Sequence, residues 1–328
     1  MTATTTPMTT DTFTADFAAL QARAADAGSD WLNDLRERGM ADFARLGIPT
    51  TRDEAWKFTS LKSLADTAFT VADDAPQLSR ADIEPWLIDG LDADLLVFVD
   101  GRYSEAMSHL RPAPEGVTIR PLAVALAEHR DLVEPHLGRL VETSDDAFSA
   151  LSNAFIENGL FVHVAAGKAA ERPIHVLSIA TRRDQPIVCH SRNLIVAEPD
   201  ANVAVIEQYV GLDDGVYLTN ALTERIADER AHVQHYLLER ESERAFNIST
   251  LKIHQRADSD VHSHTALLGG RIVRNNVHPV LAGDDIHCLI NGLFIGHGDQ
   301  HMDNQMRVEH AALRGDSRQF YKGILRDK

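Results

Sequence analysis

Cysteine and long apolar runs are scarce in this sequence. Only two cysteines, Cys189 and Cys288, occur in 328 residues, too few for a disulfide framework, and they form no CxxC zinc pair. We therefore expect a reducing compartment, the cytoplasm. No uncharged apolar run reaches the roughly 18 residues of a membrane span. Residues 1–10 form a polar lead, expected to be disordered, without the basic and apolar regions of a signal peptide.

Positive charge and catalytic motifs are also scarce. The formal net charge is −17, from 49 acidic and 32 basic residues, which argues against nucleic-acid binding and against docking on anionic membranes. The sequence contains no GxxxxGK[ST] phosphate loop, no GxGxxG after a strand and no GxSxG elbow. The residues form no catalytic constellation, so we expect a protein that is not an enzyme.

What is present is a helical beginning followed by a long β region. Residues 11–155 predict a helical and mixed α/β part, in which Phe13, Phe17 and Leu20 fall at helical spacing. Residues 156–328 predict a β core, because short apolar runs alternate with turn residues and no convincing helical period appears. Periodicity alone leaves a sandwich, a closed barrel and a β-helix open, since no exact repeat is visible.

Histidine is plentiful, with 16 residues, and it is a common metal ligand. The pair His262 and His264 shares one face of an expected strand, because side chains alternate along a strand. The opposite face has the apolar ends, Val261 and Leu267, so we expect the two histidines to face outward or toward a partner. Their flanking residues lack the Gly and Glu of a cupin metal site, and a structural or interface role is favoured.

Two further places carry metal-ligand hypotheses. In "DDIHCLING", His287 and Cys288 are neighbours and point to opposite faces, so Cys288 is expected to be buried and the two cannot share a metal unless the strand bulges. In "GHGDQHMDNQ", His297 lies in a turn, whereas His301 and Asp303 share a strand face. A complete site needs about four ligands, which a distant loop or a partner must supply. A polar outer face is the simpler interpretation.

Several motifs resemble the SufB/SufD family of iron–sulfur cluster assembly proteins. Upstream, "EAWKFTSL" is similar to the Glu-x-Trp-Lys-[FY]-Thr box of the SufD branch, and "NAFIENGLFVHVAAGKAAERPIHVL" fits the same family. The stretch from residue 268 to 325 carries further matches, which are Gly270, Arg271 and Arg274, the 281–283 step, residues 291–294, Gln300, Asp303 and His310, and the closing "SRQFYKGIL".

The resemblance implies a right-handed parallel β-helix core flanked by helical parts. It implies a non-enzymatic scaffold subunit that pairs with a SufB-like subunit and recruits a SufC-like ATPase. An iron–sulfur cluster or iron would be held only transiently in the full complex, and we expect no cofactor bound by this chain alone. A SufB-type cluster scaffold and a stand-alone metal-binding β protein using His287, His297 and His301 remain the alternatives. A carbohydrate-active β-helix enzyme lacks the secretion signal and the line of carboxylates such enzymes use.

The end of the sequence differs from the family pattern. Family members continue past the "YKGIL" strand into a His-Gly-Ala-Thr motif and a helical part that provides the main SufC contact. We therefore expect the β core to be incomplete at its C-terminus, and the family's site residues match no position here. The strand in residues 318–328 is expected to be an unpaired edge, which would favour aggregation and fast hydrogen exchange.

Overall fold

The computed structural model describes residues 10–24, 30–72 and 74–327. Of the predicted disordered lead, only Thr10, the first residue of a helix, lies within them. The protein is mainly β, with 42% of residues in strands and 20% in helices, and it combines an N-terminal helical part with a β-solenoid of about six turns. The β-helix is therefore the correct member of the three architectures that periodicity left open.

The first helices form as their spacing predicts. Helix α1 buries Phe13, Phe17 and Leu20 on one face, and α2 ends before Gly47, whose φ of 67° suits glycine. The elements of this part are α1 (Thr10–Ala24), α2 (Asp30–Leu46), η1 (Glu54–Trp56), α3 (Lys62–Ala65), β1 (Thr70–Val71), α4 (Arg80–Ile83) and η2 (Glu84–Trp86).

A mixed segment follows and already contributes to the sheets. Strand β2 pairs in parallel with β6 of the solenoid, and β4 pairs antiparallel with β5. Its elements are β2 (Asp94–Val99), β3 (Arg102–Tyr103), β4 (Val117–Pro121), α5 (Leu122–Glu128), α6 (Arg130–Val133) and α7 (Ala147–Ala154). The β structure thus begins earlier in the chain than residue 156, where the sequence pattern changes.

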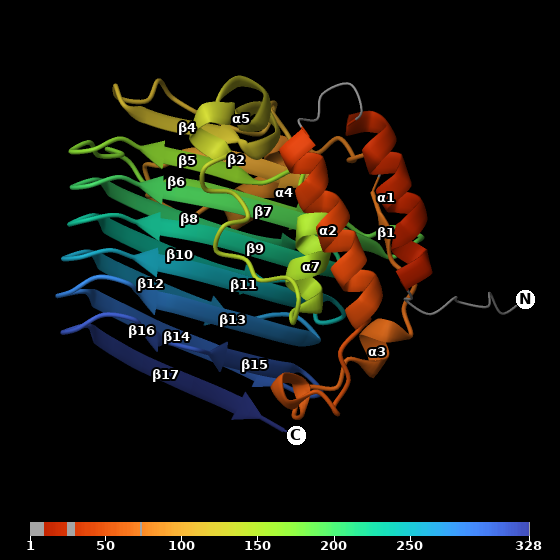
Figure 1. Cartoon of the computed structure of the whole chain (residues 1–328). Helices are drawn as coiled ribbons and strands as arrows, with labels where there is room; N and C mark the ends of the chain where they lie inside the picture. The colour runs from red at the N-terminus through yellow and green to blue at the C-terminus, as the bar shows by residue number, and fades with distance from the viewer. Residues whose placement is uncertain (1–9, 25–29, 73, 328) are drawn as a thin grey trace, which may run out of the picture.

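The remaining strands alternate between two sheets. From β5 to β15, odd-numbered strands lie in one sheet, the odd sheet, and even-numbered strands lie in the other, the even sheet. Strand β16 joins the odd sheet and β17 the even sheet, and the strands stack in layers as Figure 1 shows. The strands are β5 (Leu160–Val164), β6 (Ile174–Ala180), β7 (Ile187–Ala197), β8 (Asn202–Gly211), β9 (Tyr217–Ala227), β10 (His232–Arg240), β11 (Phe246–Gln255), β12 (Asp260–Leu267), β13 (Ile272–Leu281), β14 (His287–His297), β15 (His301–Met306), β16 (Glu309–His310) and β17 (Asp316–Arg326).

Each strand pairs in parallel with the one a full turn later. In the odd sheet, Val188 pairs with Leu218, Leu218 with Phe246, Phe246 with Ile272, and Ile272 with His301. A turn therefore takes roughly 26 to 30 residues, within the range of solenoid repeats. The variable length explains why no exact period is visible in the sequence.

One corner of every turn uses the same backbone conformation. A residue with positive φ precedes each strand of the even sheet from β8 on, and these residues are Asp200, Arg230, Asp258, Asp285 and Arg314. Aspartate tolerates this left-handed region better than most non-glycine residues, whereas arginine has no such preference. The shared conformation brings the first residues of the even strands into one column.

Apolar side chains fill the solenoid between the two sheets. The interior core includes Val162, Val203, Val233 and Val261, all buried. Leu218, Phe246 and Ile272 instead lie on the outer face of the odd sheet, where they pack with α1, α2 and α7. Figure 1 shows these helices as a layer over one end of the strands. The odd sheet is thus buried on both faces at this end, which is typical of parallel sheets.

The contact between α2 and α7 depends on one glycine. A methyl group at Gly39 would lie 2.6 Å from the backbone N of Ala154 and 2.7 Å from the carbonyl O of Ala150. Only glycine permits this approach, because an ordinary Cβ contact begins at about 3.4 Å. The two helices are therefore held at backbone contact.

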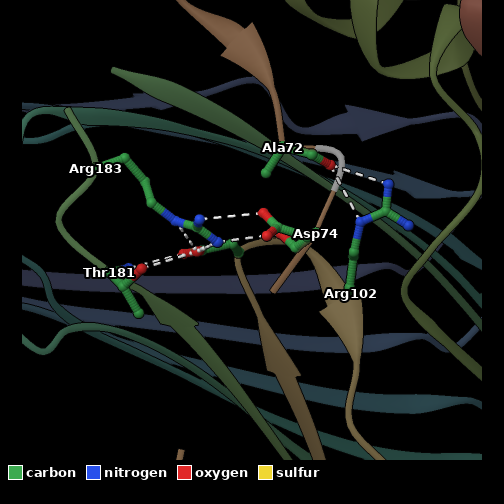
Figure 2. A network of polar contacts seen from close by, with 6 residues as sticks. Ala72, Asp74, Arg102, Thr181 and Arg183 are labelled. Atoms are coloured by element: carbon green, nitrogen blue, oxygen red, sulfur yellow. Dashed lines mark hydrogen bonds and ion pairs between the residues drawn. The ribbon is translucent and has the colours of Figure 1, made fainter. Parts of the chain in front are cut away.

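A polar network ties the segment around β1 to the first turns of the solenoid. Figure 2 shows Arg183 between Asp74 and Thr181, and Arg102 at the carbonyl of Ala72. The carboxylate of Asp100 accepts bonds from the backbone N and Oγ1 of Thr181, both 2.8 Å, and from Nε of Arg183 at 2.9 Å. This network fixes the helical part to the β body.

The last strand, β17, lies at the far end of the even sheet. It pairs with β14 from Asp316 to Arg326, so the predicted strand is present. Phe320, Ile324 and Leu325 are 65%, 50% and 70% exposed. In the described part of the chain, no helix combines the length and apolarity needed to cross a membrane.

Candidate functional site

The Trp-Lys-Phe-Thr motif lies against the outer face of the odd sheet. Trp56 ends η1 and is buried, and the guanidinium of Arg274 on β13 stacks over its ring at 4.3 Å. Arg274 also donates from Nε to Oδ1 of Asn276 at 2.8 Å. The upstream motif and the Gly-Arg-x-x-Arg motif, far apart in sequence, therefore meet in one place.

His301 and Asp303 complete this cluster from β15. Asp303 forms an ion pair with Nη1 of Arg274 and accepts a hydrogen bond from Oγ1 of Thr59, 244 residues earlier in sequence. The ring Nε2 of His301 lies 3.0 Å from the same Oγ1. The two residues share a face, as the sequence predicts, and a distant segment does supply their partners. The partners are Thr59 and Arg274, and Arg274 in turn stacks on Trp56, so the carboxylate serves a structural contact.

The remaining two motif residues, Lys57 and Phe58, point into solvent. Phe58 is 85% exposed, and Nζ of Lys57 lies 5.6 Å from its ring centre. We call Trp56, Thr59, Arg274, His301 and Asp303 the junction cluster. The junction cluster anchors the motif, and the anchored motif presents an aromatic ring outward. Such an arrangement suits a contact surface better than a reaction centre.

The other predicted metal ligands lie apart from one another. The side chain of His287 is exposed, with Nδ1 3.8 Å from Asp316. Cys288 is buried inside the solenoid, as predicted, and burial raises the pKa of its thiol to about 12. His297 pairs with Glu243 at 3.2 Å. Among the described residues, no three His, Cys, Asp or Glu side chains stand ready to hold a metal ion.

His262 and His264 face outward, as predicted. Both are half-buried, while Val261 and Leu267 on the other face of β12 are buried. The ring of His264 stacks on Tyr236 with centres 5.3 Å apart. Nε2 of His262 lies 3.1 Å from Oδ1 of Asp260. Both contacts lie on the outer surface of β12, where strand parity predicts the two rings.

Sequence reasoning missed a set of fully buried ionisable groups. Arg192 on β7 and Glu224 on β9 form an ion pair of 2.5 Å with neither side chain exposed. Glu224 also accepts bonds from the backbone N of Gly138 at 2.6 Å and of Leu140 at 2.8 Å. The pair thus joins two turns of the solenoid to the loop between α6 and α7.

A second buried group lies inside the solenoid. Glu207 accepts bonds from Tyr209, Thr223 and Asn193, and its Oε1 lies 3.1 Å from Nε2 of His235. Burial lowers the pKa of His235 to about 4, so the ring is neutral near pH 7. These polar residues occupy inward positions of their strands. The sequence of each strand shows only an ordinary alternation of side chains, so the contact between the residues becomes visible only from the strand register.

A third buried group consists of two acidic residues, Glu239 and Glu241. Glu241 accepts from Thr219 at 2.5 Å and from Asn247 at 2.7 Å, while Glu239 accepts from the backbone N of Glu241 and of Gly269. Burial, with the nearby charge of Glu239, raises the pKa of Glu241 to about 8. Glu241 is therefore protonated at neutral pH. The carboxylates of Glu224, Glu207 and Glu241 are buried and accept hydrogen bonds from neighbouring protein atoms, which suits a structural role. Nε of Arg192 is buried without a hydrogen-bond partner.

Two family models match this chain. The SufBD protein N-terminal region matches residues 8–176, and the SufBD core domain of the SUF system for FeS cluster assembly matches residues 179–328. The chain belongs to the SufBD family. The matches meet within β6, so the region matched by the N-terminal model includes the first strands of the solenoid as well as the helices.

Individual members of the SufBD family align over most of the chain. An iron–sulfur cluster assembly SufBD family protein of Synechocystis is 26% identical over 94% of this chain, which covers 70% of that protein. SufD of Escherichia coli is 27% identical over 89% of this chain and 66% of its own length. SufB of Bacillus subtilis is 19% identical over 90% of this chain and 65% of its own length. The chain thus spans about two thirds of these relatives.

Proposed function

We propose that this protein is a scaffold subunit of a SUF-type iron–sulfur cluster assembly complex, of the SufD type. The observation that carries the proposal is the match of both SufBD family models, which together extend from residue 8 to residue 328. SufD relatives from Escherichia coli and Bacillus subtilis, 27% and 24% identical, support the SufD type. The role is to hold partner proteins, with a cluster or iron as cargo, in the cytoplasm.

The architecture suits holding partners. The solenoid is a stack of parallel strands bonded turn to turn, and the motif after α2 is fixed to it by the junction cluster. Within the helical layer, α2 and α7 are held together at Gly39. Such a body offers rigid, extended surfaces. The described carboxylates with raised pKa, Glu239 and Glu241, are buried beneath the surface, where they stabilise the fold rather than meet a substrate.

The partners we propose are a SufB-like subunit and a SufC-like ATPase. ATP hydrolysis belongs to the latter, and this chain acts without enzymatic activity of its own. The exposed apolar side chains of β17, Phe320, Ile324 and Leu325, together with Phe58, are surfaces that a partner subunit can cover.

Co-expression with SufB- and SufC-type proteins tests the proposal. We expect the chain to co-purify with the SufB-type protein and to elute with it at the mass of a heteromer in size-exclusion chromatography with light scattering. A chain that stays monomeric beside both proteins would contradict the proposal. Pairing with a SufD-type protein instead of a SufB-type protein would assign it to the SufB type.

A further inference from the structure

Histidine and aspartate alternate at the first positions of successive strands of the even sheet. His232 of β10 is in register with Asp260 of β12, Asp260 with His287 of β14, and His287 with Asp316 of β17. Neighbouring parallel strands lie about 4.8 Å apart, so these side chains project side by side. We call these four residues the His–Asp column.

The turn geometry of the solenoid creates the column. Each member stands two residues after a turn residue with positive φ, which for the four turns are Arg230, Asp258, Asp285 and Arg314. The column therefore follows from a repeated backbone conformation, which places its members at equal heights. His262 stands two residues after Asp260, on the same face of β12, and adds a third imidazole.

Asp260 is the centre of this group. Its Oδ1 lies 3.1 Å from Nε2 of His262, and its Oδ2 lies 3.6 Å from Nδ1 of His232. Ligand atoms around one metal ion, each about 2.0–2.2 Å from it, are separated by roughly 3 to 3.5 Å. The spacing of the donor atoms about Asp260 is thus already near that of a coordination shell.

The surroundings leave room for an ion. His232, Asp260, His262 and His287 all line one open groove on the surface, together with Asp258, Leu289, Cys288, Asp316 and Arg318. The side chains of His232 and His287 are 59% and 68% exposed, so they rotate at little cost. Arg318 is the one cation of the lining, and it is paired with Asp316 at 2.9 Å.

We propose that Asp260, His262 and His232 bind a divalent first-row transition-metal ion, with His287 within reach as a fourth ligand. Imidazole nitrogens with one carboxylate favour Zn²⁺, Ni²⁺, Co²⁺ or Fe²⁺ over Mg²⁺ and Ca²⁺, which prefer oxygen. The three groups reach ligand geometry by rotation of exposed side chains, which is why the described residues show no preformed set. The site stands independently of the proposed scaffold role.

Calorimetric titration of the untagged chain with Zn²⁺ and Ni²⁺ at pH 7.4 tests this site. We expect about one ion per chain, at least tenfold weaker binding in Asp260→Asn and in His262→Asn, and no comparable binding of Mg²⁺. His297→Asn is the matched control, since His297 is an exposed histidine paired with Glu243 outside the groove. Its affinity is expected to equal that of the unchanged chain.

Co²⁺ absorption gives a second readout. Tetrahedral ligation produces visible absorption bands, which should disappear in Asp260→Asn. Circular dichroism should show all variants folded, because the changed side chains are at the surface. Zn²⁺ binding that is absent, or equal in the chain and in both groove variants, would overturn the proposal.

Discussion

Two ion pairs in this protein join neighbouring turns of the same solenoid and differ in depth. Arg192 and Glu224 meet on the outer face of the odd sheet, fully buried beneath α7 and the loop before it, whereas Arg230 and Asp200 meet at the turn edge, 50% and 53% exposed. Both pairs are close, at 2.5 and 2.7 Å. The register of the strands decides which residues form a pair, and burial decides how much stability is lost when one partner is removed.

The physical cause is desolvation. Removing one partner of a buried pair leaves a charge without water or counter-ion, which costs about 3–5 kcal/mol, whereas exposed pairs are screened by solvent. Interior positions of the solenoid should therefore be intolerant of charge changes and the turn edge tolerant of them. The predictions below test this contrast in order of expected effect.

The largest effect is expected for Glu224→Ala. The change leaves the buried Arg192 without its counter-ion and the backbone N of Gly138 and of Leu140 without their acceptor. The free energy of unfolding should therefore fall by about 3–5 kcal/mol. Urea unfolding followed by circular dichroism measures it. Asp200→Asn is the matched control at the edge, since asparagine also tolerates the positive φ of 61° at this position, and it should leave the midpoint unchanged. Equal losses in the two variants would refute the contrast.

Asp303→Ala should have the next largest effect. It removes the carboxylate that Arg274 and Thr59 share, while Arg274 keeps its stacking on Trp56 and its bond to Asn276. We expect a loss of about 1–3 kcal/mol, because a buried donor loses its acceptor. Hydrogen exchange should rise in residues 54–65, and unchanged exchange there would show that the junction cluster does not anchor the motif.

Gly39→Ala tests the helical layer. The added methyl group meets backbone atoms of α7, which cannot move aside as a side chain can, so α2 must shift. Overpacking of this kind costs about 1–3 kcal/mol, reduced by the better helix propensity of alanine. Ala44→Ser, at an exposed position of α2, is the control and should change stability by less than about 0.5 kcal/mol. Equal stability of both variants would show that α2 and α7 accommodate a methyl group at residue 39.

How far the fold could be predicted from sequence follows from its periodicities. Phe13, Phe17 and Leu20 predict α1, and strand parity correctly buries Cys288 and exposes His287, because both patterns are local. The architecture could not be fixed by pattern, because turns of unequal length hide the repeat. Only the resemblance to the SufB/SufD family selected the β-helix, which the structure confirms.

The candidate site was predictable only in part. Parity placed His301 and Asp303 on one face, but their partner Thr59 comes from a segment 244 residues away, which no local pattern reveals. The buried pair Arg192 and Glu224 was missed for the same reason. Charged residues in a β sequence are assigned to solvent by default, and only the register of β7 with β9 and the cover by the loop before α7 show that these two meet out of solvent.

The smallest predicted effect concerns the pH dependence of the buried acid Glu241. Its pKa of about 8 in the folded protein exceeds its ordinary value of 4.5, so the folded state binds the extra proton and loses this stabilisation as pH rises through 8. The lowered pKa values of His190, His235 and His278, about 3, 4 and 4, act in the opposite sense. Their contribution is complete above about pH 7.

The window from about pH 7 to 8 therefore reports mainly on Glu241, because the raised pKa values of the buried Cys189 and Cys288 thiols lower stability chiefly at higher pH, where these thiols ionise in the unfolded chain. The free energy of unfolding should fall by about 1 kcal/mol across it in the unchanged protein and stay nearly level in Glu241→Gln, whose amide retains the contacts to Thr219 and Asn247. Asp285→Asn at the edge should follow the unchanged protein, because Arg314 holds the pKa of Asp285 below its usual range, far from this window. A slope that persists in Glu241→Gln would assign it to another group and weaken the claim that burial governs the interior charges.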